Sequence, residues 1–109
     1  MNGQNVDTHH IEMAFEHIVK KYVCDWVRAD NFSYVENPIP GQERENIINL
    51  GRIIAWLDAA LYNLGKELKD KSPEKYRIVK SHRNNIWFSN DLSPITKALR
   101  DLLEKNIID

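Results

Sequence analysis

Two polar residues with the capacity to bind an anion occupy positions where the surrounding pattern predicts apolar side chains. In a helix predicted over residues 73–88, the apolar stripe from Val79 to Ile86 passes through His82 and Arg83. Both side chains can donate hydrogen bonds to a carboxylate or a phosphate. Burying an unpaired Arg costs several kcal/mol, so we expect these residues to reach a partner group, a cleft or a subunit boundary.

The most obvious internal partner for Arg83 is Asp58, which lies in a second, longer predicted helix. Asp91, shortly after the 73–88 helix, is the other candidate carboxylate. Under a structural interpretation, Arg83 reaches toward the surface and pairs with Asp58 or Asp91. Under a functional interpretation, His82 and Arg83 line a polar binding site. The residue pattern leaves both interpretations open.

The residues from Arg83 onward resemble a known motif. The run Arg83-Asn84-Asn85-Ile86-Trp87-Phe88-Ser89 is similar to the motif of the HEPN superfamily, in which an Arg is followed by a polar residue and, four to six residues after the Arg, by a His. Arg83 and Asn84 match its opening, and Ile86 and Trp87 match its apolar interior. Ser89 stands at one of the positions allowed for the His, and no His follows Arg83.

A second pair, Arg77 and His82, has the spacing of this motif without the polar residue after the Arg. The resemblance implies an all-α, often dimeric fold and metal-independent RNA cleavage, with Arg and His acting on the 2′-hydroxyl and the scissile phosphate. The catalytic candidates that it implies are Arg83, His82 and Arg77. Because the His of the first match is missing, the resemblance favours RNA binding or association over catalysis.

The helix predicted over residues 43–71 is the element that positions the others. Seven consecutive positions, spaced alternately three and four residues apart, are all Ile or Leu: Ile47, Leu50, Ile54, Leu57, Leu61, Leu64 and Leu68. Such a repeat forms one apolar seam along a helix. About 28 residues make a helix of roughly 42 Å, longer than the sphere of roughly 34 Å expected for a compact domain of this size. The bundle is therefore elongated, the helix bends, or its end pairs with a second copy.

Gly51 and Gly65 share one heptad position of this helix, with Asp58 between them. A glycine inside a helix costs on the order of 1 kcal/mol relative to Ala. Close approach of another helix explains such glycines, and simple tolerance explains them equally well.

Two Ser-Pro pairs mark the starts of the last two helices, because Ser caps a helix and Pro fits its first turn. Ser72-Pro73 begins the helix at 73–88 and Ser93-Pro94 begins one at 94–107. An apolar stripe that includes Ile11, Phe15 and Trp26 predicts a first helix at 8–29. The sequence thus predicts a single domain over residues 1–109, an all-α antiparallel four-helix bundle with one long central helix. The connection at 31–42 is too apolar for a free linker, and we expect it to pack across the bundle or against another chain.

The remaining residue types favour no metal and no cofactor. His9, His10 and His17 lie near two glutamates, but no other predicted helix supplies a matching set of ligands. A lone Cys24 cannot form an internal disulfide, which fits a reducing cytoplasm, and we interpret it as a core residue. Neither a signal peptide nor an apolar run of membrane-spanning length is visible.

Charge is unevenly distributed although the net charge is only −1. Residues 66–83 contain seven Lys or Arg against three Asp or Glu, whereas residues 1–65 contain five against nine. The basic segment can meet phosphate or an acidic partner, or it can be a solvated helix face.

These patterns predict a non-catalytic cytoplasmic protein that acts by protein–protein association, as a homodimer, in the manner of a regulator, an antitoxin or a phage or immunity-type inhibitor. The expected binding residues are His82, Arg83, Trp87, Asp58 and Trp56. Trp and Arg are frequent anchors of protein interfaces. The alternative is an HEPN-like RNA-binding protein or ribonuclease. DNA and membranes are not expected partners, since the chain lacks a helix-turn-helix pattern and an apolar span.

Overall fold

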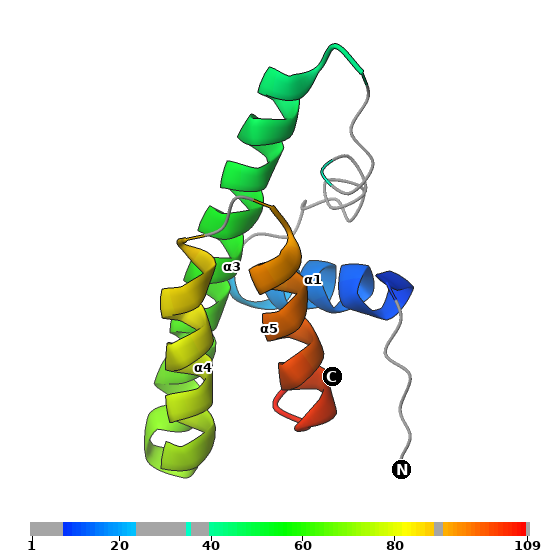
Figure 1. Ribbon diagram of the computed structural model, residues 1–109. Coiled ribbons are helices and arrows are strands. Elements are labelled where there is room, and N and C mark those ends of the chain that lie inside the picture. The colour runs from blue at the N-terminus through cyan, green and yellow to red at the C-terminus, as the bar shows by residue number, and fades with distance from the viewer. Residues whose placement is uncertain (1–7, 24–34, 36–39, 89–90, 109) are drawn as a thin grey trace.

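The computed structural model describes residues 8–23, 35, 40–88 and 91–108 of the 109-residue chain. Within these ranges the chain forms four helices and no strand, which confirms the all-α class (Figure 1). The helices are α1 (Thr8–Tyr22), α3 (Glu43–Lys71), α4 (Pro73–Ile86) and α5 (Ser93–Glu104). No helix among the described residues combines the length and apolar character needed to cross a bilayer.

The helices α3 and α4 form a hairpin joined at Ser72. Its register is visible in the contacts, because Gly65 lies beside Tyr76 whereas Asp58, seven residues earlier, lies beside Arg83. The helix α1 packs on α3 and α5, and α5 packs on α4. Figure 1 shows α1 running crosswise to α3 and α5. The finer prediction, an antiparallel bundle built around a central α3, stays a prediction.

The start of α4 follows the predicted capping chemistry. The hydroxyl of Ser72 accepts a hydrogen bond from the Lys75 backbone N–H at 3.5 Å, and Pro73 occupies the first turn. The start of α5 differs from the prediction, because Ser93 is already inside the helix and its side chain caps nothing. Instead, the Asp91 carboxylate accepts a hydrogen bond from the Ser93 N–H at 2.8 Å. An acidic side chain suits the positive end of a helix.

Two helices end earlier than the sequence pattern predicts. The helix α4 ends at Ile86 rather than at residue 88, and α5 ends at Glu104 rather than at residue 107. Beyond α5, Asn106 adopts a left-handed conformation with φ of 58°, and the Ile107 N–H donates to the Leu102 carbonyl at 2.9 Å. This is a Schellman ending, which Asn tolerates. The predicted end of the first helix at residue 29, together with Cys24 and Trp26, lies outside the described residues, as does most of the 31–42 connection.

The apolar core contains buried residues of all four helices, and those of α3 lie in the middle of that helix. Its α3 contribution includes Ile53 and Ala60 together with four buried seam positions: Ile54, Leu57, Leu61 and Leu64. Leu50 and Leu68, the next seam positions outward, are only partly buried. The prediction of a continuous core seam is wrong at its first position, because Ile47 is 70% exposed. The N-terminal turns of α3 project beyond the other helices (Figure 1).

The long helix gives the molecule its shape. The principal-axis extents are 46 × 30 × 26 Å, and a 29-residue helix accounts for about 43 Å of the longest. Of the three explanations for the length of α3, elongation of the domain is therefore confirmed. The first turns of α3, from Glu43 to Arg52, form an overhang whose apolar side chains lack the cover that the rest of the seam has.

Candidate functional site

Arg83 pairs with Asp58, as one of the two sequence-based pairings predicted. Its Nε lies 2.8 Å from Asp58 Oδ1 and its Nη2 lies 3.5 Å from Oδ2. The Arg83 side chain is 36% exposed, so it reaches the surface from a position on the inward stripe of α4. The alternative partner, Asp91, caps α5 instead. The pair therefore resolves the apparent conflict between an arginine and an apolar stripe.

Asp58 also holds two aromatic side chains in place, one directly and one through Arg83. The indole Nε1 of Trp87 donates to Asp58 Oδ1 at 2.7 Å, and the Arg83 guanidinium lies 4.7 Å from the centre of the Tyr62 ring. Asp58 and Tyr62 are four residues apart on α3, so they share a helix face. Arg83 and Trp87 have the same spacing at the C-terminal end of α4. We call these four residues the Asp58 cluster. Tyr62 was not predicted, although its spacing from Asp58 is a usable signal.

The Asp58 cluster borders exposed apolar surface. Trp87 is 57% exposed, and Phe88, the next residue, is 85% exposed. The hydrogen bond to Asp58 fixes the polar edge of the Trp87 indole and leaves much of its apolar ring area open to solvent. Such an arrangement presents a large, oriented aromatic group at little cost in conformational entropy.

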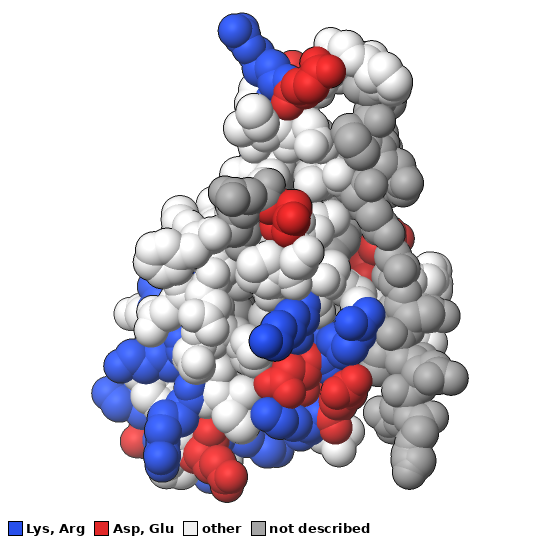
Figure 2. Space-filling view, viewed as in Figure 1, with Lys and Arg blue, Asp and Glu red and all other residues white. Residues whose placement is uncertain are grey.

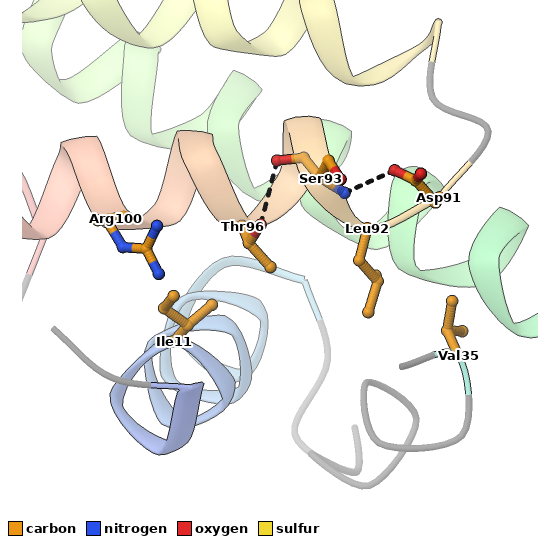
Figure 3. A pocket seen from close by; sticks show the side chains of 7 residues that line it. All are labelled: Ile11, Val35, Asp91, Leu92, Ser93, Thr96 and Arg100. Atoms are coloured by element: carbon orange, nitrogen blue, oxygen red, sulfur yellow. Dashed lines mark hydrogen bonds between the residues drawn. The ribbon is translucent and has the colours of Figure 1, made fainter. Parts of the chain in front are cut away.

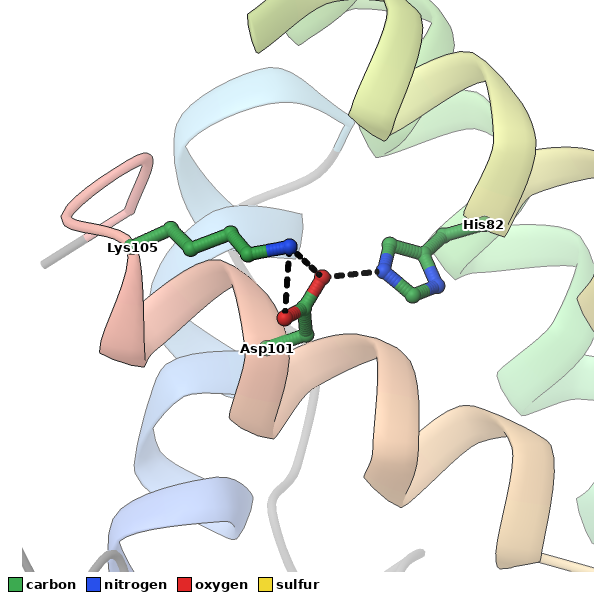
Figure 4. Close-up of polar contacts among 3 residues, drawn as sticks. All are labelled: His82, Asp101 and Lys105. Atoms are coloured by element: carbon green, nitrogen blue, oxygen red, sulfur yellow. Dashed lines mark hydrogen bonds and ion pairs between the residues drawn. The ribbon is translucent and has the colours of Figure 1, made fainter.

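His82 faces a different helix from Arg83. Its Nε2 lies 2.7 Å from Asp101 Oδ2 on α5, and the Lys105 ammonium lies 3.1 and 3.2 Å from the two carboxylate oxygens (Figure 4). Consecutive residues on a helix do not face the same direction. The prediction that His82 and Arg83 line a common polar site is therefore wrong. Each is tied to its own carboxylate.

The His82–Asp101 contact connects α4 to α5. Burial alone would raise the pKa of Asp101, but hydrogen bonds from His82 and Lys105, together with their charges, hold that pKa below its usual value. Asp101 and Lys105 were not predicted from the sequence. The spacing of four residues between them is typical of a helix pair, but nothing in the sequence indicates that it meets His82.

The other two predicted residues lie apart from the Asp58 cluster. Trp56 is partly buried, and its ring lies 6.5 Å from that of Phe15, so it packs α1 against α3. Arg77 and His82 both line a shallow groove of about 370 Å³ between α4 and α5. The structure thus brings together Asp58, Arg83 and Trp87 of the predicted binding residues.

A second hollow of about 370 Å³ lies between α1 and the start of α5 (Figure 3). Its apolar side chains, Ile11, Val35 and Leu92, point into it. The side chains of Asp91 and Thr96 serve the local backbone, since Asp91 caps α5 and the Thr96 hydroxyl donates to the Ser93 carbonyl at 3.1 Å. Within the described ranges, no three His, Cys, Asp or Glu side chains gather as metal ligands would. We find no nucleophile–base pair that this hollow would position.

The overhang of α3 lies on the N-terminal side of the Asp58 cluster. At Gly65 the Tyr76 ring of α4 lies 3.4 Å from the position of a Cβ, which supports close helix approach there. At Asp58, seven residues before Gly65 on the same helix, Arg83 and Trp87 contact α3. At Gly51 no described atom outside its own stretch of helix lies within 4 Å of the position of a Cβ. The difference arises because α4 has 14 residues and α3 has 29.

Comparison of the chain with protein-family models, with curated proteins and with solved structures finds no match. The resemblance of Arg83-Asn84 to the HEPN motif therefore stays a prediction from sequence. The chemistry of the candidate site is defined by its own contacts: one carboxylate, one guanidinium and a set of exposed aromatic and aliphatic side chains.

Proposed function

We propose that this chain is a non-catalytic cytoplasmic protein that acts through protein–protein association and forms a homodimer. The observation that carries the proposal is the early end of α4, which leaves apolar side chains exposed both at the end of α4 and on the overhang of α3. We call this surface the α3–α4 step and define it by five residues: Ile47, Ile48, Gly51, Trp87 and Phe88. The cytoplasmic location rests on the sequence alone.

The composition of the α3–α4 step supports an interface. Ile47, Trp87 and Phe88 are 70%, 57% and 85% exposed, and Ile48 is 39% exposed. Four large exposed apolar side chains at one end of the α3–α4 hairpin therefore support an association site. Trp is among the residues that dominate binding energy at interfaces, and its orientation here is already fixed by Asp58.

A second copy of the chain is a suitable occupant of the overhang. The seam residue Ile47 continues the core pattern of α3, so an apolar helix of the same type completes its burial. In a two-fold antiparallel pairing centred near Ile48, Glu45 of one copy lies near Arg52 of the other, and the reverse pairing follows by symmetry. Figure 2 shows mostly uncharged residues along the overhang behind a charged tip.

The proposal includes the prediction of an antiparallel bundle, with α3 as the scaffold on which the other helices and the second copy pack. It also places the protein among small chains that work by binding another protein, such as regulators, antitoxins and phage or immunity-type inhibitors. No step of the proposal uses a cofactor or a metal. The Asp58 cluster has the role of orienting Trp87 at the edge of the interface.

Sedimentation velocity over a concentration series tests the homodimer. The wild-type chain is expected at twice its mass of 12.8 kDa. Ile47→Lys places a charge at the centre of the proposed contact and is expected to shift the species toward the monomer. Met13→Lys, at a 48% exposed apolar residue of α1, is the matched control and should sediment like wild type. A wild-type monomer at every concentration, or equal effects of both variants, would overturn the proposal.

The alternative function is HEPN-like RNA binding, and one observation favours it: Arg77 and His82, the second motif match, line the same groove between α4 and α5. The test is affinity for a single-stranded RNA probe, with Arg77→Ala as the variant. Arg77 is exposed, so its removal leaves the fold intact. Salt-dependent wild-type binding that the variant loses supports this function, and absence of wild-type binding excludes it.

A further inference from the structure

Two rows of side chains with the same spacing flank the contact between α3 and α4. In each row a tyrosine is followed by cations four and seven residues later, which places all three on one face of the helix. The rows are Tyr62, Lys66 and Lys69 on α3 and Tyr76, Lys80 and Arg83 on α4. Because the helices run in opposite directions, the tyrosines lie toward opposite ends of the groove. We call this groove the Tyr62–Tyr76 groove.

The floor of the groove is apolar and contains a hollow of about 170 Å³. Leu61, Gly65 and Val79 line it, and the absence of a side chain at Gly65 lets the Tyr76 ring lie close to α3. An engineered protein cavity of about 150 Å³ binds benzene, so the hollow has room for one aromatic ring. Cofactor and drug sites are typically about 300–1,000 Å³, and this hollow is smaller. Its size therefore fits a single inserted side chain.

The rim of the groove is positive. Of its four cations, Arg83 is neutralised by Asp58, which leaves the charges of Lys66, Lys69 and Lys80. No carboxylate lines the hollow. Figure 2 shows Lys and Arg side chains gathered at the end of the molecule where α3 joins α4, with Asp and Glu among them. Three lysines around an apolar hollow are complementary to carboxylates that flank an apolar side chain.

We propose that the Tyr62–Tyr76 groove binds an acidic segment of a partner protein, which inserts one aromatic side chain between the two tyrosines and places carboxylates against Lys66, Lys69 and Lys80. This inference rests on the proposed association function and names the chemistry of a second, different partner. Tyr62 belongs both to the Asp58 cluster and to this groove, since Arg83 and Lys66 lie 4.7 and 5.2 Å from its ring centre.

The dimensions and charge favour a peptide over a nucleic acid. Residues 62–69 span about 10 Å along α3, which is the length of about three residues of extended chain. Affinity for nucleic acid grows with the number of phosphates neutralised, and three lysines on a chain of net charge −1 neutralise few. Acidic peptides need only the short contact that the groove offers.

Fluorescence anisotropy with a labelled peptide, one Phe flanked on each side by three Glu or Asp residues, tests this proposal. The wild-type protein is expected to bind it, and Lys80→Glu is expected to weaken binding about three- to tenfold, the range for reversing one rim charge. Lys97→Glu, at an exposed lysine near the middle of α5, makes the same charge change away from the groove and should leave affinity within about twofold. A peptide with Ala in place of Phe should bind more weakly.

Absence of peptide binding up to about 1 mM, the weak end of measurable association, would overturn the groove inference. Equal loss in Lys80→Glu and Lys97→Glu would also overturn it, because the attraction would then be general. A twelve-nucleotide single-stranded probe that binds more tightly than the peptide at the same salt would assign the groove to nucleic acid instead. The sedimentation of Ile47→Lys is read separately, so the homodimer and the groove can fail independently.

Discussion

Replacing Asp58 by Ala removes the one acceptor shared by Arg83 and Trp87, and its cost follows from their exposure. Hydrogen bonds to charged groups contribute about 1.5–3 kcal/mol when buried, but exposed ion pairs contribute about 0–1 kcal/mol. Asp58 is 19% and Arg83 36% exposed, so water replaces part of the lost interaction. We expect a loss of about 1–2 kcal/mol in the free energy of unfolding, which corresponds to a fall of about 5–10 °C in Tm.

Urea unfolding of four proteins measures this effect: wild type, Asp58→Ala, Arg83→Ala and the double variant. Because the two side chains contact each other, the coupling energy is expected to be about 1 kcal/mol. Asp58→Asn is the matched control, since it keeps an oxygen acceptor for the Trp87 indole and removes the charge that holds Arg83. Its loss should lie between those of wild type and Asp58→Ala. Wild-type stability in Asp58→Ala, or strictly additive single effects, would refute the reasoning.

Two further predictions concern pH. Because the pKa of Asp101 is lowered in the folded protein, the unfolded chain binds more protons in acid. The contribution of Asp101 to the free energy of unfolding is therefore present above the ordinary Asp pKa of about 3.9 and is lost as pH falls through the lowered value. Urea unfolding at stepwise lower pH should therefore show a shallower loss of stability in Asp101→Asn than in wild type. The control Asp70→Asn, at an exposed carboxylate, should follow wild type. The same loss of stability with falling pH in all three proteins would contradict this. Burial, the hydrogen bond to Glu67 and the charge of Glu67 raise the pKa of Tyr22 to about 12. The native phenol should stay protonated while an unfolded tyrosine titrates near 10, so this contribution is complete below about pH 10 and is lost as pH rises toward 12. Tyr22→Phe should abolish that alkaline loss, and an unchanged alkaline unfolding curve in the variant would disprove the assignment.

The sequence predicted the parts of the fold that follow from local spacing. The start of α3 at Glu43 and its end at Lys71 match the pattern, and so does the start of α4 at Pro73, because Ser72 caps this helix and Pro73 fits its first turn. Helix ends were predicted less well. The helix α4 ends two residues before the apolar pattern does, which leaves Trp87 and Phe88 exposed.

Part of the candidate site could also be predicted from local spacing in the sequence. Arg83 stood out because it interrupts an apolar stripe, and Asp58 of the long helix was its most obvious internal carboxylate partner, with Asp91 as the alternative. That His82 points in a different direction from Arg83 follows from helical geometry, but its partner Asp101 depends on the packing of α4 against α5. Likewise Ile47 has the residue type of a core position, and only the lengths of the neighbouring helices show that the core ends before it.

The most direct test of the association claim is a dilution series of ¹⁵N-labelled protein followed by two-dimensional NMR. On dilution, the amides of Ile47, Ile48, Gly51 and Phe88 and the indole of Trp87 are expected to shift together toward the monomer, while the amide of Met13 stays fixed. Uniform positions at all concentrations, with the tumbling time of a 12.8 kDa monomer, would contradict the account.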